Sequence, residues 1–258
     1  MKEKIFTIPV NDAFNTQCEC PICILEKDLE KKTLEFILGP SSMEPDTRII
    51  TNEKGFCRHH FKLLYLKHSN VLGLSLVIDT HIQHQMNLYK KLYEKNIKSI
   101  ESDAKTTSIA NLTQQLTKKN TNTKKYIDET TNLLDGLEDT CEICDKVTST
   151  LENYFDVIFW MYFKDIEFRN KVKNSKGFCL RHYNMLLKSA KIHLATKQLA
   201  LFILDINKLM LANMDRLLDE VQWFSQKFDH RNEKASWKNS KDAVPRAIEK
   251  FISYCDFK

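Results

Sequence analysis

The feature that most constrains this chain is a six-residue phrase that occurs twice. Residues 52–57 and residues 174–179 both read Asn-x-Lys-Gly-Phe-Cys, and a histidine, His60 or His182, follows three residues later. A Cys-x-Ile-Cys pair precedes each phrase at nearly the same distance. This repetition indicates a duplicated unit that carries a set of metal ligands.

Structural zinc takes four ligands in a tetrahedron, drawn from cysteine thiolates and histidine imidazoles. Taking each repeat by itself, we predict one site at Cys20, Cys23, Cys57 and His60 and another at Cys141, Cys144, Cys179 and His182. Both sets are Cys3His with no open position, which is typical of structural sites. Two zinc ions are therefore expected. Iron–sulfur is the less favoured alternative, because each set includes a histidine and lacks ferredoxin-like spacing.

Comparing the two copies also excludes neighbouring candidates. Cys18 corresponds to Asp139, and His59 corresponds to Arg181, so neither is reproduced in the second copy. Cys255 has no counterpart at all. We therefore keep them out of the predicted sites.

Composition favours an all-α fold. The 258 residues include only five Gly and five Pro, too few for the many turns of a sheet protein of this length. Apolar residues recur at helical spacing after each cysteine motif. We expect two pseudo-repeated, zinc-pinned helical units, with a loop at 41–54 in the first and a corresponding loop around 167–169 in the second. A C-terminal clasp follows.

The predicted domain boundaries follow the repeat. Residues 1–98 form the first unit, 99–125 a polar connector rich in Thr, Asn, Gln and Lys, and 126–228 the second unit. Residues 229–258 have no partner in the first half. We expect this aromatic-rich tail to pack back on the bundle.

Charge and hydropathy restrict the partners and the compartment. The net charge of +5 is spread along the chain, which does not resemble the clustered basic face of a nucleic-acid-binding protein. The most apolar run, residues 154–163, is interrupted by Asp156 and is about half the length of a membrane span. With no recognisable leader at residues 1–10, we expect a cytoplasmic protein without membrane or nucleic-acid partners.

Two polar groups outside the repeat are weaker candidates for function. His81 and His84 lie one helical turn apart, although the second copy has no such pair. The tail carries a second group, made of Asp229, His230, Arg231, Ser240, Lys241, Asp242 and Arg246. For the tail group we favour surface ion pairs and helix caps on a docked tail over a functional pocket. No nucleophile elbow, phosphate-binding loop or dinucleotide fingerprint is present.

Several specific motifs extend over nearly the whole chain. They are residues 7–14, 20–23, 43–46, 55–57, 72–74 with 79–81, 177–182, and the tail from 223 to 246. With these motifs the chain resembles an uncharacterised family of cytoplasmic proteins from low-GC Gram-positive, largely anaerobic bacteria. The resemblance implies no activity, because the family is one of unknown function.

The sequence therefore favours a zinc-stabilised intracellular helical protein that binds or scaffolds an unidentified protein or small molecule. Two alternatives remain open. One is a thiol-based redox or metal sensor, for which Cys18 beside Cys20 is the extra thiol. The other is an enzyme whose site lies between the two units and uses His81, His84 or the Asp229–Arg231 group.

Overall fold

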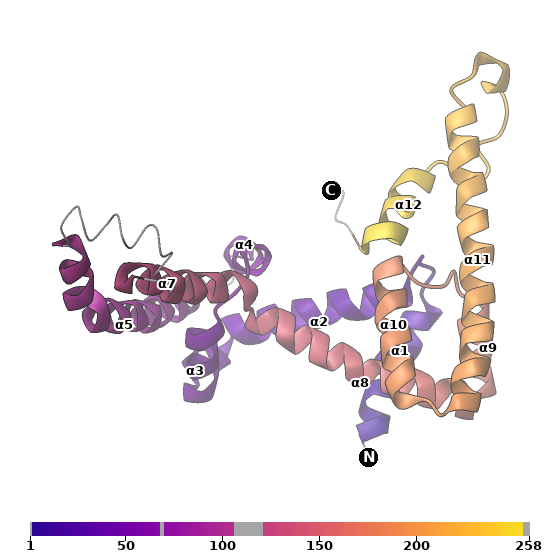
Figure 1. The fold of residues 1–258 in the computed structure, drawn as a ribbon. Helices are drawn as coiled ribbons and strands as arrows, with labels where there is room; N and C mark the ends of the chain where they lie inside the picture. Colours follow the sequence, from indigo (N-terminus) through magenta and orange to yellow (C-terminus); the bar gives the residue numbers. More distant parts are fainter. Residues whose placement is uncertain (1, 68–69, 106–120, 255–258) are drawn as a thin grey trace. The chain divides into compact units, whose positions relative to one another are not determined.

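A computed structural model describes residues 2–67, 70–105 and 121–254, and within these ranges it contains helices and no strand (Figure 1). The elements are α1 (Lys2–Asn15), α2 (Pro21–Leu38), η1 (Pro40–Met43), α3 (Pro45–Lys54), α4 (Arg58–Leu66), α5 (Val71–Ala104), α7 (Asn122–Asp139), α8 (Glu142–Lys164), α9 (Ile166–Asn174), α10 (Leu180–His193), α11 (Thr196–Gln226), η2 (His230–Asn232) and α12 (Ala243–Ile252). The all-α prediction is confirmed.

Local signals explain where α2 begins and ends. Pro21 occupies the first helical position, where its missing N–H costs nothing, and Gly39-Pro40 follows the last helical residue. The prediction of long loops at 41–54 and around 167–169 was wrong, because α3 and α9 occupy these segments. Pro45 at the start of α3, and Asp165, which accepts from two backbone N–H groups of α9, are helix-start signals.

The chain forms two compact units that are nested in the sequence. We call residues 1–30 with 147–258 the outer unit, and residues 31–146 the inner unit. The boundaries therefore fall inside α2 and α8. The expected division instead placed consecutive units along the chain, with boundaries at 98/99 and 125/126. Helix α5 continues to Ala104, within the segment that we expected to be a connector. Residues 106–120 of that connector lie outside the described residues.

Aromatic side chains form the core of the outer unit. The ring of Phe14 on α1 lies edge-on to Phe168 on α9, with centroids 5.0 Å apart. Phe202 of α11 makes similar contacts with Phe159 and Tyr162 of α8, at 5.3 and 5.0 Å. Most side chains of the apolar run at 154–163 are thus buried in the core of this unit.

The C-terminal tail packs back on the outer unit, where α12 contacts α10 and α11. Its start is held by Lys227 at the end of α11, whose ammonium donates to the backbone oxygens of Asn232, Glu233 and Ala235 at 2.6–2.8 Å. Further along, Lys250 of α12 is fully buried. A lysine buried in this way needs compensating partners, and these lie at the candidate metal site described below.

In the inner unit, α5 packs against α3 and α7. Helix α5 starts at Asn70, whose side chain accepts the N–H of Gly73 at 2.8 Å and donates to the backbone oxygen of Leu38 at 2.8 Å. Asn70 therefore both caps α5 and fixes it to the end of α2.

Candidate metal centres

The structure brings the eight predicted ligands together in two groups, but it pairs the motifs differently from the prediction. The first group is Cys20, Cys23, Cys179 and His182, and the second is Cys57, His60, Cys141 and Cys144. Each group joins the Cys-x2-Cys pair of one repeat to the Cys-x2-His pair of the other. We call them the outer site and the inner site, because each lies within the unit of that name.

Helix length explains why the pairing within each repeat was wrong. From Cys23 to its end at Leu38, α2 carries the chain about 22 Å, at 1.5 Å per residue. Helix α3, which follows, is only about 15 Å long. In the second repeat, α8 extends about 30 Å beyond Cys144, and α9 is about 13 Å long. Neither short helix is long enough by itself to span the distance back to its own Cys-x2-Cys pair.

Four helix N-termini supply all the ligands. Cys20 and Cys141 immediately precede α2 and α8, while Cys57 and Cys179 are the N-caps of α4 and α10. The Sγ of Cys179 accepts the backbone N–H of His182 at 3.4 Å. Free N–H groups and the helix dipole stabilise thiolates at these positions, so the sites need no cationic side chain among their ligands.

The glycine of each phrase allows the turn into the third cysteine. Gly55 and Gly177 have φ values of +59° and +76°, which favour glycine. A Cβ on Gly55 would lie 2.7 Å from the His81 ring, and one on Gly177 would lie 2.9 Å from Sδ of Met210. His81 and Met210 therefore occupy equivalent places behind the two turns, which the sequence comparison did not recognise.

At the outer site, the atom separations match the edges of a zinc tetrahedron. Zn–S and Zn–N bonds of about 2.3 and 2.0 Å imply edges of about 3.8 Å between sulfurs and about 3.5 Å between sulfur and nitrogen. Nδ1 of His182 lies 3.5, 3.3 and 3.2 Å from the Sγ atoms of Cys20, Cys23 and Cys179. The Sγ atoms of Cys23 and Cys179 are 3.7 Å apart.

The inner site has the same geometry. Nδ1 of His60 lies 3.2 Å from Sγ of Cys57 and 3.3 Å from the Sγ atoms of Cys141 and Cys144. The Sγ atoms of Cys57 and Cys144 are 3.8 Å apart. Both donor sets therefore fit a tetrahedral ion bound through three sulfurs and one Nδ1 nitrogen.

Contacts that do not involve the ligands support the exchanged pairing at the inner site. The hydroxyl of Thr140 donates to the backbone oxygen of Lys54 at 2.8 Å, and the N–H of Glu142 donates to the oxygen of Gly55 at 3.1 Å. The Lys54 ammonium lies 2.7 Å from a carboxylate oxygen of Asp145. The turn before Cys57 is thus attached to the start of α8.

At the outer site, Lys250 makes the corresponding connection. Its ammonium donates to the backbone oxygens of Glu19 and Lys176, at 3.1 and 2.6 Å. These oxygens belong to the two segments that lead into the ligand turns. Burial lowers the pKa of Lys250, and the charges of Glu19, Cys20 and Cys179 oppose this shift. Three thiolates and one dication carry a net charge of −1, which a lysine ammonium offsets.

Three further side chains lie around the outer ligands. Nε2 of His182 lies 3.1 Å from a carboxylate oxygen of Glu26. Arg181 holds the same oxygen at 2.7 Å. The hydroxyl of Ser253 lies 3.3 Å from Sγ of Cys23. A carboxylate behind a ligating histidine orients the ring and raises its basicity.

The protonation of the ligands fits cation binding. The pKa of Cys179 is well below its usual value because the thiols of Cys20 and Cys23 donate to it. Burial disfavours the charged ring of His182, but hydrogen bonds to Cys179 and Cys23 raise its pKa to about 11. Burial also opposes ionisation of Cys141, yet the hydrogen bond to His60 lowers its pKa to about 6. Because a metal displaces the remaining protons, its binding is expected to weaken at acid pH.

The other candidates lie outside the two ligand groups. Cys18 is half-buried, and burial raises the pKa of its thiol to about 11. His81 is within hydrogen-bond distance of the backbone oxygen of Asn52, 2.9 Å from its Nδ1 atom, and so supports the inner turn. Cys255 lies outside the described residues.

The polar group of the tail serves local structure. Asp229 accepts the backbone N–H and the guanidinium of Arg231 and lies 3.3 Å from the almost fully exposed His230. Arg246 instead joins the ion network of Glu19 and Glu220. Arg246 also pairs with Asp242, and these two residues line a cavity together with Lys241, so the structure gathers part of the tail group but not Asp229, His230 and Arg231.

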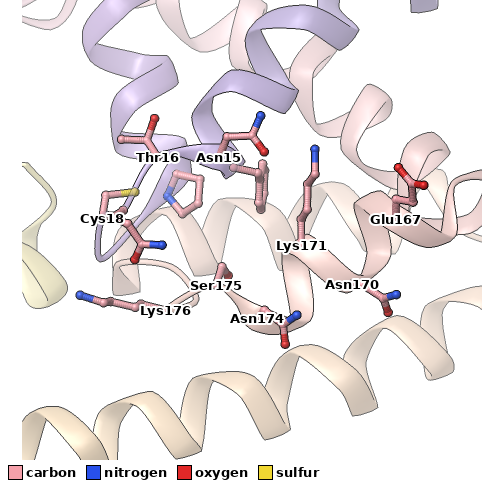
Figure 2. Close-up of a pocket in the computed structure, with 12 residues that line it drawn as sticks. Asn15, Thr16, Cys18, Glu167, Asn170, Lys171, Asn174, Ser175 and Lys176 are labelled. Carbon is pink, nitrogen blue, oxygen red and sulfur yellow. The ribbon is translucent and has the colours of Figure 1, made fainter.

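A polar cavity of about 460 Å³ borders the outer site (Figure 2). Its walls come from the end of α1, from α9 and from the two segments that lead into the outer ligand turns. Figure 2 shows Lys171 and Asn174 on the α9 side, and Cys18 and Lys176 near the ligand segments. The lining includes two lysines and three asparagines without a dominant apolar wall.

Comparison with known proteins places the whole chain in one family. The model of a family of unknown function, DUF6062, matches residues 1–258. The chain belongs to DUF6062. Membership in DUF6062 assigns no activity, and no curated protein or solved structure matches the chain. Among the described helices, none combines the length and the apolar character needed to cross a bilayer.

Proposed function

We propose that this protein is a zinc-stabilised helical scaffold in which two Cys3His sites hold distant parts of the chain together. The observation that supports this most strongly is the nesting of the two ligand sets. The outer site joins residues 20–23 to 179–182, and the inner site joins 57–60 to 141–144. Each ion would thereby close its own compact unit.

The energetics suit a structural role. Zinc binding to a structural site contributes about 10–16 kcal/mol in small zinc domains, which is as large as the whole stability of a typical domain. Full coordination leaves no position for substrate or water. The metal would therefore hold surfaces for an intracellular protein or small-molecule partner in place, rather than carry out a reaction.

Metal analysis of paired variants tests this proposal and the pairing together. The unmodified protein should contain two zinc ions. Cys20→Ser with Cys179→Ser removes two ligands from the outer site, so one zinc should remain. Cys20→Ser with Cys57→Ser is the matched control, because it damages both sites and should lose both ions.

The reverse outcome would show that each repeat binds its own ion. Iron with inorganic sulfide in the purified protein would instead contradict the zinc assignment. The helical circular dichroism signal should fall when a chelator removes the metal, because binding free energy is part of the folding free energy.

A second candidate function, redox sensing, is favoured by the exposure of the inner site. Cys144 is exposed and Cys57 is half-buried, whereas all four outer ligands are buried. Hydrogen peroxide would transfer one oxygen atom to a thiolate, which becomes a sulfenic acid, and its other oxygen would leave as hydroxide. The thiolate 3.8 Å away would then attack that sulfur, forming a disulfide and expelling a second hydroxide, and the zinc would be released.

Peroxide titration separates the two candidates. A sensor should release one zinc at low peroxide equivalents, and thiol mapping should identify a disulfide between Cys57 and Cys144. Cys18 is a poor candidate for the reacting thiol, because burial raises its pKa. If both ions stay bound at high peroxide excess, the scaffold remains and the sensor is excluded.

A further inference from the structure

Helix α11 carries an apolar stripe on the side opposite its buried face. Phe202, Ile206, Leu209, Met210 and Leu217 point into the outer unit. At 100° per residue, Leu204, Leu211 and Leu218 lie roughly opposite them, and these three side chains are 70, 68 and 55% exposed. A helix that faced only water would carry polar residues there.

The stripe repeats every seven residues, which is the period of a helix that packs along another helix. Leu204, Leu211 and Leu218 occupy one line, about 21 Å long at 1.5 Å per residue. Leu201, 43% exposed, extends it at the N-terminal end. A straight apolar line of this length fits a partner helix better than a compact small molecule.

The charges on the stripe are self-complementary. Lys208 and Asp215 are both exposed and lie between successive leucines, on either side of Leu211. From Leu204 to Leu218 the order along the stripe is Leu, Lys208, Leu, Asp215, Leu. In the opposite direction the leucines come in the same order, and Asp215 takes the place of Lys208. Across the described residues, neither Lys208 nor Asp215 forms an ion pair.

We propose that α11 is a dimerisation helix that packs antiparallel against α11 of a second copy of this chain. A twofold axis near Leu211 places Leu204 of each copy beside Leu218 of the other. It also places Lys208 of each copy beside Asp215 of the other, so this ion pair forms twice in the dimer. A surface that complements itself is what a twofold interface requires.

The antiparallel arrangement follows from the positions of the charges. A parallel pair in register would set Lys208 near Lys208 and Asp215 near Asp215, and like charges face each other unfavourably. The proposal does not depend on zinc, because no residue of the stripe is a metal ligand. The dimer proposal can therefore be tested independently of the proposed scaffold function.

Sedimentation equilibrium of the zinc-loaded full chain tests the dimer. Leu211→Glu places two carboxylates together at the axis, so the dissociation constant should rise more than about a hundredfold. Ile192→Glu is the matched control, because Ile192 is 78% exposed on α10 and lies off the stripe. It should leave the dissociation constant unchanged, and both variants should keep the helical signal of the parent.

A charge exchange tests the orientation. Lys208→Glu alone or Asp215→Lys alone should weaken the dimer about tenfold, because each creates two like-charge contacts. The double variant restores opposite charges and should recover most of the affinity. A monomeric parent at about 100 μM, or a dimer that Leu211→Glu leaves intact, would overturn the proposal.

Discussion

The outer and inner sites have the same four donor types but different surroundings. All four outer ligands are buried, and Glu26, Lys250 and Ser253 lie around them. At the inner site Cys144 is exposed, and the nearby ion pairs of Lys54 are at the surface, with 39% of the Lys54 side chain exposed. The two sites therefore differ in the groups behind their predicted ligands, and such groups tune how firmly a site holds its metal.

The largest expected difference concerns the two lysines. Lys250→Met leaves one buried and one partly buried backbone oxygen without a donor and the outer thiolates without a nearby cation, so the unfolding free energy should fall by about 2–4 kcal/mol. Lys54→Met at the exposed inner pair should cost less than about 1 kcal/mol. Thermal melts of the zinc-loaded variants measure both. Equal losses of stability in the two variants would show that Lys250 stabilises the outer site no more than Lys54 stabilises the inner site.

Chelation kinetics should separate the ions next. Because two inner ligands are accessible to solvent, the inner zinc should leave at least about tenfold faster than the outer zinc. A chromogenic chelator should record two phases of equal amplitude. Cys20→Ser with Cys179→Ser should abolish the slow phase, whereas loss of the fast phase would reverse the assignment.

Glu26→Gln should affect the outer site alone. Removing the carboxylate behind His182 should weaken metal binding there by about tenfold, as loss of such groups typically does. Competition with a calibrated chelator gives both affinities, and the inner affinity serves as an internal control. An unchanged outer affinity would show that the carboxylate does not orient the ring.

The smallest expected effect is on the stability of the outer unit and comes from Asp205, which is not a predicted metal ligand. Asp205 accepts from Tyr162 at 2.5 Å and from Arg169 at 2.8 Å, and it lies 2.9 Å from the ammonium of Lys173. Burial alone would raise the pKa of this carboxyl, but Arg169, Tyr162 and Lys173 hold it well below its usual range. A depressed folded pKa means that Asp205 stabilises above its unfolded pKa of about 3.9 and loses this effect as the pH falls.

Asp205→Asn should therefore cost about 1 kcal/mol near neutral pH, because solvent screens this partly exposed group, and progressively less below about pH 4. Denaturant titrations of parent and variant at several pH values measure the difference. A difference that stays constant down to strongly acidic pH would show that the carboxylate charge does not stabilise the fold.

Duplication shows each predicted metal-binding residue twice in the sequence, and the structure gathers these eight residues in two Cys3His groups. The repeat favours His60 over His59 and excludes Cys18, and the structure places His60 but neither His59 nor Cys18 in a Cys3His group. The same reasoning paired the motifs wrongly, because the spacing along the chain is compatible with either pairing. Pro45 and Gly55 were visible as helix boundaries, and recognising α3 from them would have revealed the error.

The sequence by itself determined the helical class and pointed to the eight cysteine and histidine residues that the two groups contain, because composition, helix signals and ligand chemistry are local properties. Only the tertiary structure decided which donors meet. Helices α2 and α8 are rigid over 18 and 23 residues, so each carries the chain away from its own Cys-x2-Cys pair and leaves that pair to the other repeat. The distance that a stiff helix covers, rather than the number of residues between motifs, sets the pairing.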